Sequence, residues 1–284
     1  MTLIEAKDYA ARKLRGAGVL DYLLESDLIL CKVLGCDRAW IIAHKERPIF
    51  DYELEYLEAL LERRCKREPL AYIFGEAYFY GRSFFIGEGV LIPRPETEIL
   101  VETALSFVKE GVILDWGTGS GCVVISLLLE NPKLSGVALD ISPKALSWTW
   151  RNVRKFDLFA RMLLWHESVR LPQKYGNHSF DMIVSNPPYI PTKEISCLMP
   201  EVKCYEPLRA LDGGYDGMRW YRLLFEKAPL WLKEGGWLLV ESGGKEQTDA
   251  IISMTHQSFK LHEVKSLNGG VSIVIWEYDK NCPL

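Results

Sequence analysis

The sequence predicts an α/β fold, namely a doubly wound, mostly parallel sheet of seven strands with a small all-helical domain before it. Three observations predict this. After Gly111, apolar runs of strand length alternate with amphipathic stretches of helix length, as in parallel sheets covered on both faces. Residues 1–68 show helical patterns only. Residues 69–92 alternate aromatic residues with glycines, which favours a β-hairpin linker between the two domains.

The composition excludes several classes of function. Of the 284 residues, 48% are apolar and 25% are charged, with a formal net charge of −4, so no broad nucleic-acid-binding face is expected. No apolar run has membrane-spanning length and no basic-then-apolar leader opens the chain. The seven cysteines contain no C-x-x-C pair and the five histidines no H-E-x-x-H motif. We therefore expect a reduced, cytoplasmic protein without a metal and without a membrane partner.

Two helices stand out in the domain at residues 1–68. The first is predicted between the capping residue Asp21 and Gly35, which occupies the left-handed position that ends helices. Its predicted apolar face consists of Leu24, Leu28, Cys31 and Leu34.

The second helix is predicted from Asp51 to about Arg67, with acidic first turns and a basic last turn that match the helix dipole. Its apolar face holds Leu54, Leu57, Leu60 and Leu61. The basic end is either a patch for an acidic partner or a solvated helix end, and the second is the more common case.

The second domain, residues 93–284, is predicted to contain the seven strands. They lie at residues 112–115, 136–140, 161–165, 180–184, 236–240, 261–264 and 272–276. Asn268-Gly269-Gly270 separates the last two strands, and such a turn joins antiparallel neighbours. The sheet is therefore expected to be parallel with an antiparallel end.

A glycine-rich turn, Gly117-Thr118-Gly119-Ser120-Gly121, follows the first of these strands and opens a helix. Glycine permits positive φ there and lets a ligand approach the backbone closely. Asp140 ends the next strand, 19 residues after Gly121 (140 − 121), where a carboxylate can accept hydrogen bonds from both hydroxyls of a ribose. The turn and the acid together predict a cofactor that contains a nucleoside.

Two classes of cofactor use this arrangement. Dinucleotides require G-x-G-x-x-G, which places a pyrophosphate at the helix N-terminus, whereas this turn has the spacing G-x-G-x-G. S-adenosylmethionine carries no phosphate but has a cationic amino group and a sulfonium, which an acid such as Asp115 attracts. The alternative role for Asp115 is to cap the helix that follows. S-adenosylmethionine is the favoured cofactor.

Asn186-Pro187-Pro188-Tyr189 follows the fourth predicted strand, at the edge where open α/β sheets hold their ligands. The two prolines have no backbone N–H and keep the residues before them extended. The Asn186 amide and the neighbouring carbonyls are therefore expected to face outward. This group accepts hydrogen bonds without a strong acid or base, which suits a planar NH₂ group, and beside the cofactor turn it indicates methyl transfer to nitrogen.

These motifs resemble those of the release factor glutamine methyltransferases (HemK/PrmC), and the likeness spans nearly the whole chain. Asn-Pro-Pro-Tyr is shared by methyltransferases that act on planar amide or amine nitrogens, DNA-adenine enzymes included. Residues 90–98 (VLIPRPETE) and 206–217 (EPLRALDGGYDG) are similar to signatures of the family itself. The related ribosomal-protein glutamine methyltransferases differ in the proline-rich linker, so the resemblance favours a release factor as substrate.

The resemblance implies transfer of a methyl group from S-adenosylmethionine to the side-chain amide nitrogen of the glutamine in the Gly-Gly-Gln motif of peptide chain release factors. It implies that the cofactor is bound by Gly117, Thr118, Gly119, Ser120, Gly121, Asp140 and Asn186. It implies that the glutamine is held by Asn186, Pro187, Pro188 and Tyr189, with Asn186, Pro187 and Tyr189 catalytic. Residues 1–68 would help to dock the protein substrate, and we expect a monomer that does not bind nucleic acid directly.

Two positions depart from the family. Trp116 stands where a smaller aliphatic residue is common, and the region around Glu167 and Ser168 lacks the usual Ser-Asp-aromatic pattern that meets the adenine. Glu167 or Ser168 is the expected substitute. Two roles stay open for Arg94, Glu96 and Glu98, which are either salt-bridged at the start of a helix or in contact with the partner. Residues 206–217 either fold over a bound segment or form an ordinary ordered crossing.

Three alternatives compete with this interpretation. An amino-methyltransferase acting on DNA adenine would share both motifs but requires a basic groove and a means of flipping the base. Another protein glutamine, in a ribosomal protein, is a second alternative substrate. A non-catalytic binding module would be expected to have a damaged cofactor turn, whereas this turn is intact.

Overall fold

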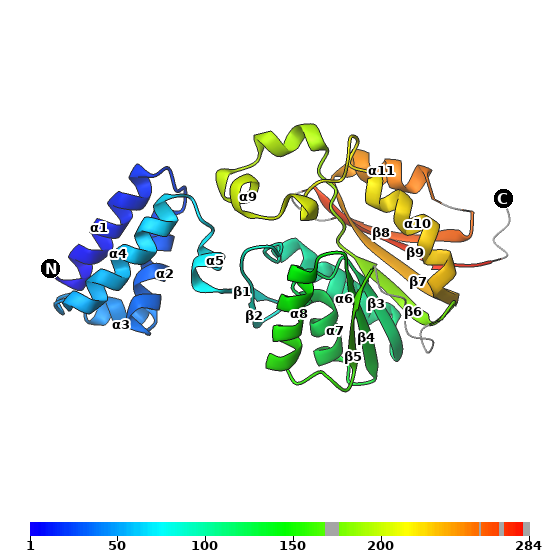
Figure 1. Cartoon of the computed structure of the whole chain (residues 1–284), viewed down its shortest axis with the longest axis horizontal. Helices are drawn as coiled ribbons and strands as arrows, with labels where there is room; N and C mark the ends of the chain where they lie inside the picture. Colours follow the sequence, from blue (N-terminus) through cyan, green and yellow to red (C-terminus); the bar gives the residue numbers. More distant parts are fainter. Residues whose placement is uncertain (168–175, 256, 267–269, 281–284) are drawn as a thin grey trace. The chain divides into compact units, whose positions relative to one another are not determined.

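The computed structural model describes residues 1–167, 176–255, 257–266 and 270–280. The chain divides into a helical unit, residues 1–75 with 199–205, and a sheet unit, residues 76–198 with 206–284 (Figure 1). The helical unit thus continues past the boundary expected at residue 68 and includes a short segment from far along the chain. In the described residues no helix is both long and apolar enough to cross a membrane.

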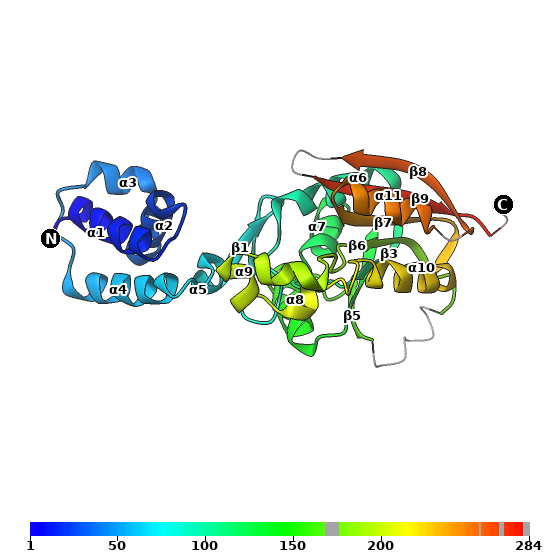
Figure 2. The same cartoon turned by 90° about the horizontal axis from the view of Figure 1, so that it is seen from above.

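The helical unit is built around a core supplied mainly by three helices. They are α1 (Leu3–Gly16), α2 (Tyr22–Leu34) and α4 (Asp51–Cys65). The shorter helices are α3 (Arg38–Ala43), α5 (Leu70–Phe74) and α9 (Pro200–Tyr205), and Figure 2 shows α4 leading along the chain into α5. The helix α5 occupies the beginning of the region expected to be a hairpin, so the hairpin itself starts later.

The helix α2 lies where it was predicted but buries a different face. Gly35 ends it with φ 64°, yet Leu24 and Leu28 are exposed whereas Ile29 and Leu30 are buried. Apolar residues surround much of this helix, so its periodicity does not select one face. The buried face also carries Asp27, whose carboxylate forms ion pairs with Lys7 (2.6 Å) and Arg38 (2.7 Å).

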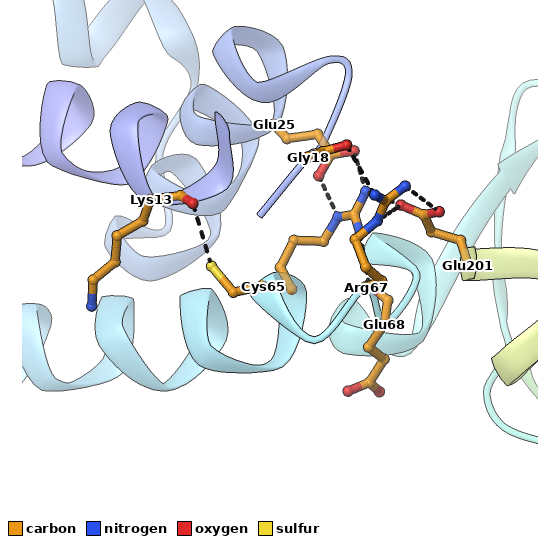
Figure 3. A network of polar contacts seen from close by, with 8 residues as sticks. Lys13, Gly18, Glu25, Cys65, Arg67, Glu68 and Glu201 are labelled. Carbon is orange, nitrogen blue, oxygen red and sulfur yellow. Dashed lines mark hydrogen bonds and ion pairs between the residues drawn. The ribbon is translucent and has the colours of Figure 1, made fainter. Parts of the chain in front are cut away.

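Part of the basic end of α4 is an internal ion-pair cluster (Figure 3). The expected solvated helix end therefore holds for Arg63 and Lys66, whose side chains are exposed, but not for Arg64. The Arg64 side chain is 5% exposed and pairs with Glu25 at 2.5 Å and with Glu201 of α9 at 2.9 Å. Arg67 donates two hydrogen bonds of 2.7 Å to Glu201. Carboxylates therefore neutralise this cluster in place of solvent, and one of them comes from a segment that the sequence pattern could not connect to α4.

The sheet unit opens with an antiparallel hairpin, β1 (Glu76–Phe79) and β2 (Arg82–Phe85). A seven-stranded sheet follows in the order β5-β4-β3-β6-β7-β9-β8. Its strands are β3 (Gly111–Trp116), β4 (Leu134–Asp140), β5 (Met162–His166), β6 (Phe180–Ser185), β7 (Leu232–Gly243), β8 (Phe259–Ser266) and β9 (Val271–Tyr278). The first five strands are parallel, and β9 is antiparallel to β7 and β8. The predicted fold class is confirmed; Asn268 and Gly269 of the expected turn lie outside the described residues.

Helices cover both faces of this sheet (Figure 1). One face packs against α6 (Glu98–Phe107), α7 (Cys122–Glu130) and α8 (Pro143–Lys155), and the other against α10 (Arg219–Trp231) and α11 (Lys245–Ser253). Neighbouring residues of β3 show the alternation, because Ile113 enters the first core and Leu114 the second. The short 3₁₀ helices are η1 (Pro95–Thr97), η3 (Thr192–Cys197) and η4 (Leu208–Ala210).

Replacing Glu201 by alanine is expected to loosen the helical unit, because the buried Arg64 guanidinium then keeps only one of its two carboxylate partners. Removing one member of a buried ion pair destabilises by about 3 kcal/mol. Hydrogen–deuterium exchange of peptides from α2 and α4 should accelerate. The matched control is Glu62→Ala, which breaks an exposed pair with Lys66 and should change the stability by less than about 0.5 kcal/mol. Equal hydrogen–deuterium exchange rates in the two variants would contradict a stabilising role of the Arg64–Glu201 pair.

Candidate active site

The candidate site lies where the carboxyl ends of β3 and β6 meet. These strands are neighbours, yet β4 follows β3 on its other side, so the strand order changes direction here, as at the ligand sites of doubly wound sheets. The Ser185 hydroxyl donates a 2.7 Å hydrogen bond to the Trp116 carbonyl and joins the two strand ends. A pocket opens beside this bond, with about 770 Å³ of space that protein atoms do not fill, solvent at the mouth included.

The predicted glycine turn contributes two of its residues to the pocket lining, Gly117 and Gly119. Gly117 has φ 77°, and a side chain there would project into open space, so glycine is needed for its backbone conformation. Thr118 and Ser120 are buried. Gly121 has φ 80° and precedes α7 as its N-cap. The structure therefore divides the turn into residues that face the pocket and residues that fix its shape.

Asp115 is buried beneath the glycine turn and stabilises it through a hydrogen bond. It is 2% exposed, does not line the pocket, and accepts a 2.7 Å hydrogen bond from the Thr118 hydroxyl. Burial raises the pKa of Asp115 to about 7, although bonds from Thr118 and from the Val124 backbone N–H oppose the rise. Because Val124 lies in the first turn of α7, these contacts support the alternative in which Asp115 caps the helix.

Asp140 lies at the end of β4 and lines the pocket. Its Oδ2 accepts a 3.0 Å hydrogen bond from the Gly119 N–H, and its Oδ1 accepts one of 2.8 Å from the Ser142 N–H. Burial raises the pKa of Asp140, and these two bonds together with the charge of Arg209 oppose the rise. Each carboxylate oxygen keeps further lone pairs, so the group can accept two hydroxyl donors without releasing the turn.

The Asn186 amide is held from behind by a chain of buried polar groups. Its Nδ2 donates a 2.9 Å hydrogen bond to Thr97 Oγ1, and the Thr97 hydroxyl donates one of 2.7 Å to Glu241 Oε2. Thr97 is 3% exposed and Glu241 is fully buried. Since Asn186 lines the pocket and its NH₂ end faces Thr97, its Oδ1 is the end left for a ligand.

The residues after Asn186 separate into two groups. Pro187 and Pro188 line the pocket, whereas Tyr189 does not. The Tyr189 ring packs so closely on Gly243 that a side chain at Gly243 would clash with it, and burial raises the pKa of Tyr189 to about 12. A role for Tyr189 against a substrate stays a prediction.

Residues 206–217 form an ordered crossing over the Asn-Pro-Pro-Tyr segment. Ile190 donates to the Leu211 carbonyl (3.1 Å) and accepts from the Gly213 N–H (2.9 Å). A side chain at Gly213 or Gly217 would collide with the backbone of Tyr189, which explains why glycine occupies both positions. The crossing thus keeps the segment after Pro188 in place.

The sequence interpretation missed part of the pocket wall. Pro207, Arg209 and Trp220 line it, as does Trp116, which had been noted only as a departure from the family. A signal was available, because Pro207 and Arg209 belong to residues 206–217, which are expected either to fold over a bound segment or to form an ordered crossing; that expectation names no single residue as a ligand contact.

The acidic and basic residues of the linker mainly hold the protein itself together. Arg94 pairs with the buried Glu206 at 2.6 Å, and Glu98 accepts a 2.8 Å hydrogen bond from the Tyr80 N–H. The contact of Arg94 favours its salt-bridged alternative, whereas Glu98 is held by a hydrogen bond from the backbone of the hairpin. Glu167 is exposed and does not line the pocket, while Ser168 lies outside the described residues, so the contact to an adenine stays a prediction.

Comparisons with known proteins agree with this geometry. Residues 5–75 match the family described as PrmC N-terminal domain, and residues 95–200 match the methyltransferase small domain. The release factor glutamine methyltransferase of Geobacter sulfurreducens is 41% identical over 249 residues, 87% of this chain and 86% of that protein. The protein of the same name from Agrobacterium fabrum is 36% identical and covers 94% of both chains.

A solved structure shows the same fold at low identity. A methyltransferase from Pyrococcus furiosus superposes with a TM-score of 0.51 at 17% identity, covering 71% of this chain and 91% of that one.

The doubly wound sheet, the glycine turn with Asp140, and an amide acceptor at the end of β6 define an S-adenosylmethionine-dependent methyltransferase that acts on nitrogen. Such a protein needs a pocket that reaches from the cofactor turn to the acceptor, and the lining from Gly117 to Pro188 meets this need. With the identity and coverage above, the chain belongs to the release factor glutamine methyltransferase family. The predicted family is confirmed.

Asp140→Ala is expected to weaken binding of S-adenosylmethionine about tenfold or more. The substitution removes the carboxylate that is predicted to accept from the ribose, and with it the hydrogen bond from the Gly119 N–H. Isothermal titration calorimetry measures this dissociation constant. Asp181→Asn is the control, since Asp181 accepts from the Val112 N–H and pairs with Lys233 at the start of β6, away from the pocket. Unaltered affinity in Asp140→Ala would remove this carboxylate from the ribose.

Proposed function

We propose that this chain methylates the glutamine side chain in the Gly-Gly-Gln motif of a peptide chain release factor, and that Asn186 and Pro187 grip the amide during the reaction. The observation that carries this proposal is the fixed Asn186 amide, whose NH₂ end is bound by Thr97. Its oxygen is therefore the group that a substrate in the pocket would meet, and an oxygen acceptor suits a ligand with two N–H donors.

The cofactor site supports this proposal through the groups that surround it. Asp140 supplies acceptors for the ribose, and the backbone at Gly117 and Gly119 allows close approach. Apolar side chains such as Ile141 and Ala145 line the pocket beyond Asp140. These groups fit S-adenosylmethionine, which supplies a methyl group on a positively charged sulfur. Thr118, Ser120 and Gly121 are predicted from the sequence to bind the cofactor but do not line the pocket, so we assign to them the shaping of the turn. Asn186, also predicted to bind the cofactor, lines the pocket at its other end.

The chain's contribution to the reaction is to aim and polarise a weak nucleophile. The nitrogen of a side-chain amide is a poor nucleophile because its lone pair is delocalised into the carbonyl. Asn186 Oδ1 and the Pro187 carbonyl would accept its two N–H groups and hold the nitrogen towards the methyl donor. As charge builds on the nitrogen, both hydrogen bonds strengthen, so they stabilise the transition state more than the ground state.

No residue needs to remove a proton before the methyl group is transferred. Two fixed acceptors hold the amide in the reactive geometry, so the entropy cost of bringing free reactants together is not part of the barrier. After transfer, the methylated nitrogen is acidic enough to release its proton to water. Tyr189 would limit the access of water from the side of Gly243, where its ring packs.

The helical unit supports recognition of a protein substrate. Residues 5–75 match a domain that the family adds to its methyltransferase domain, and we assign to it the docking of the release factor. We assign docking to the helical unit, residues 1–75 with 199–205, in place of the boundary expected at residue 68. The linker then comprises residues 76–92, and the methyltransferase domain comprises the rest of residues 93–284. We place the enzyme in the cytoplasm, where translation takes place, and expect a monomer that contacts the release factor without binding nucleic acid directly.

Asn186→Ala is expected to abolish turnover while the affinity for S-adenosylmethionine stays nearly unchanged, because the amide acceptor is lost and the cofactor turn is intact. Loss of one fixed acceptor in a transition state reduces kcat by about a hundredfold or more. Mass spectrometry of a purified release factor after incubation measures methylation of the glutamine, and calorimetry measures the cofactor.

The matched control is a release factor in which the glutamine of Gly-Gly-Gln is replaced by glutamate, which has no NH₂ group. The wild-type enzyme should leave this protein unmodified. Full activity of Asn186→Ala on the normal substrate would contradict the mechanism, and methylation of the glutamate variant would contradict the assigned substrate.

A further inference from the structure

A side-chain amide has two ends of nearly equal size, so the shape of its pocket alone does not decide which end faces the substrate. The proposed reaction needs the Asn186 oxygen to point towards the glutamine. With the amide reversed, two N–H donors of Asn186 would face two N–H donors of the substrate, and no hydrogen bond could form. Some group outside the reacting atoms must therefore fix the orientation.

We propose that Thr97 and Glu241 are positioning residues that set the orientation of the Asn186 amide, an inference that rests on the proposed function. Thr97 comes from η1, directly before α6, and Glu241 from β7. Neither residue lines the pocket, so each acts on the reaction only through Asn186. Their sequence separations from Asn186 are 89 and 55 residues (186 − 97 and 241 − 186).

The direction of the hydrogen bonds carries this inference. A hydroxyl has one hydrogen, and that of Thr97 is donated to the Glu241 carboxylate at 2.7 Å. Only lone pairs of Thr97 Oγ1 then remain for Asn186, and a lone pair accepts from the NH₂ end of an amide but not from its oxygen. A carboxylate at position 241 therefore determines, through one hydroxyl, which end of Asn186 faces the pocket.

The burial of Glu241 supports a dedicated role for it. The residue is fully buried, and its Oε1 has no hydrogen-bond partner among the described residues. A buried carboxyl group with an unsatisfied oxygen costs stability, and a purely structural role would be served better by an apolar residue. The Asn186 side chain also lowers the pKa of this carboxyl, so Glu241 interacts with the same amide that it orients through Thr97.

Thr97→Val tests the hydrogen bonds that link Glu241, Thr97 and Asn186. The side chain keeps almost the same shape, because a methyl group replaces the hydroxyl. We expect kcat to fall about tenfold to a hundredfold while the dissociation constant for S-adenosylmethionine stays unchanged. Thr97→Ser restores the hydroxyl and should recover kcat to within about threefold of the wild type.

The matched control for Thr97→Val is Thr103→Val in α6. Thr103 is equally buried, at 1% exposure, and its hydroxyl has no hydrogen-bond partner among the described residues. The same substitution there should leave kcat at the wild-type value. Glu241→Gln supplies a second test should Thr97→Val fail to fold, because an amide at this position no longer forces the Thr97 hydroxyl to be a donor; kcat should fall about tenfold or more.

A readout that needs no substrate separates this inference from the proposed function. The side-chain NH₂ signals of Asn186, identified by their loss in Asn186→Ala, should exchange slowly with solvent in the wild type and in Thr103→Val, and quickly in Thr97→Val. Wild-type kcat together with protected signals in Thr97→Val would overturn the inference. Protected wild-type signals without methylation of a release factor would contradict the proposed function and leave the inference standing.

The ionisation of Glu241 gives a further test in the pH profile. Burial raises the pKa of Glu241 to about 7, and the charge of Glu96 adds to the rise. The hydrogen bond from Thr97, the nearby Asn186 amide and the charge of Arg94 oppose it. The other titratable groups facing Glu241 are Tyr189 and Tyr221, and the Tyr221 hydroxyl bonds its carbonyl at 2.7 Å. A protonated Glu241 can donate to Thr97 and reverse the chain of bonds.

The ionised carboxylate is the form that orients Asn186, so activity is expected above this pKa and should be lost as the pH falls through about 7. The measurement is kcat at saturating cofactor and release factor from about pH 6 to about pH 8. In Glu241→Gln the lower kcat should be flat over this range. An unchanged acidic limb in Glu241→Gln would assign that limb to another group and overturn this part of the inference.

Discussion

The site depends on one constraint, which is that β6 cannot continue past Asn186. Pro187 and Pro188 have no N–H to donate to a neighbouring strand, and the ladder with β7 ends at the pair Ser185 and Val240. Asn186 therefore lies just beyond the last pair with β7, between the end of β3 on one side and Glu241 of β7 on the other. This places the cofactor turn and Glu241 on opposite sides of one amide.

Two buried acids support the two halves of the site in the same way. Asp115 accepts a hydrogen bond from Thr118, and Glu241 accepts one from Thr97, each at 2.7 Å. Burial raises the pKa of both acids to about 7, so each makes the folded state less stable than an apolar residue would. Each acid fixes the direction in which a hydroxyl donates its hydrogen bond. Asp115 thereby holds the glycine turn through Thr118, and Glu241 orients the Asn186 amide through Thr97.

Local patterns in the sequence were sufficient to predict the sheet and the two ends of the pocket, which are the glycine turn with Asp140 and the Asn-Pro-Pro-Tyr segment. The strands, the glycine turn, Asp140 and Asn-Pro-Pro-Tyr each follow from periodicity or from backbone conformation within a few residues. The support behind them was not accessible in this way, because Thr97 and Glu241 meet across 144 residues and Arg64 and Glu201 across 137. The face of α2 also escaped prediction, because apolar residues surround that helix and the ion pairs of Asp27 complete the buried side.

The position of Glu241, which reaches Asn186 through Thr97, also explains why the group that grips the substrate amide can be neutral. A negative charge in the place of Asn186 would attract a cationic cofactor before any reaction begins, and this attraction would stabilise the ground state as well as the transition state. When Glu241 acts through Thr97, the NH₂ end of Asn186 is polarised along a chain of hydrogen bonds, and Oδ1 becomes a stronger acceptor while the residue stays neutral. The negative charge of Glu241 is thus separated from the pocket by the side chains of Thr97 and Asn186. It acts on the substrate nitrogen only by making Asn186 Oδ1 a stronger acceptor.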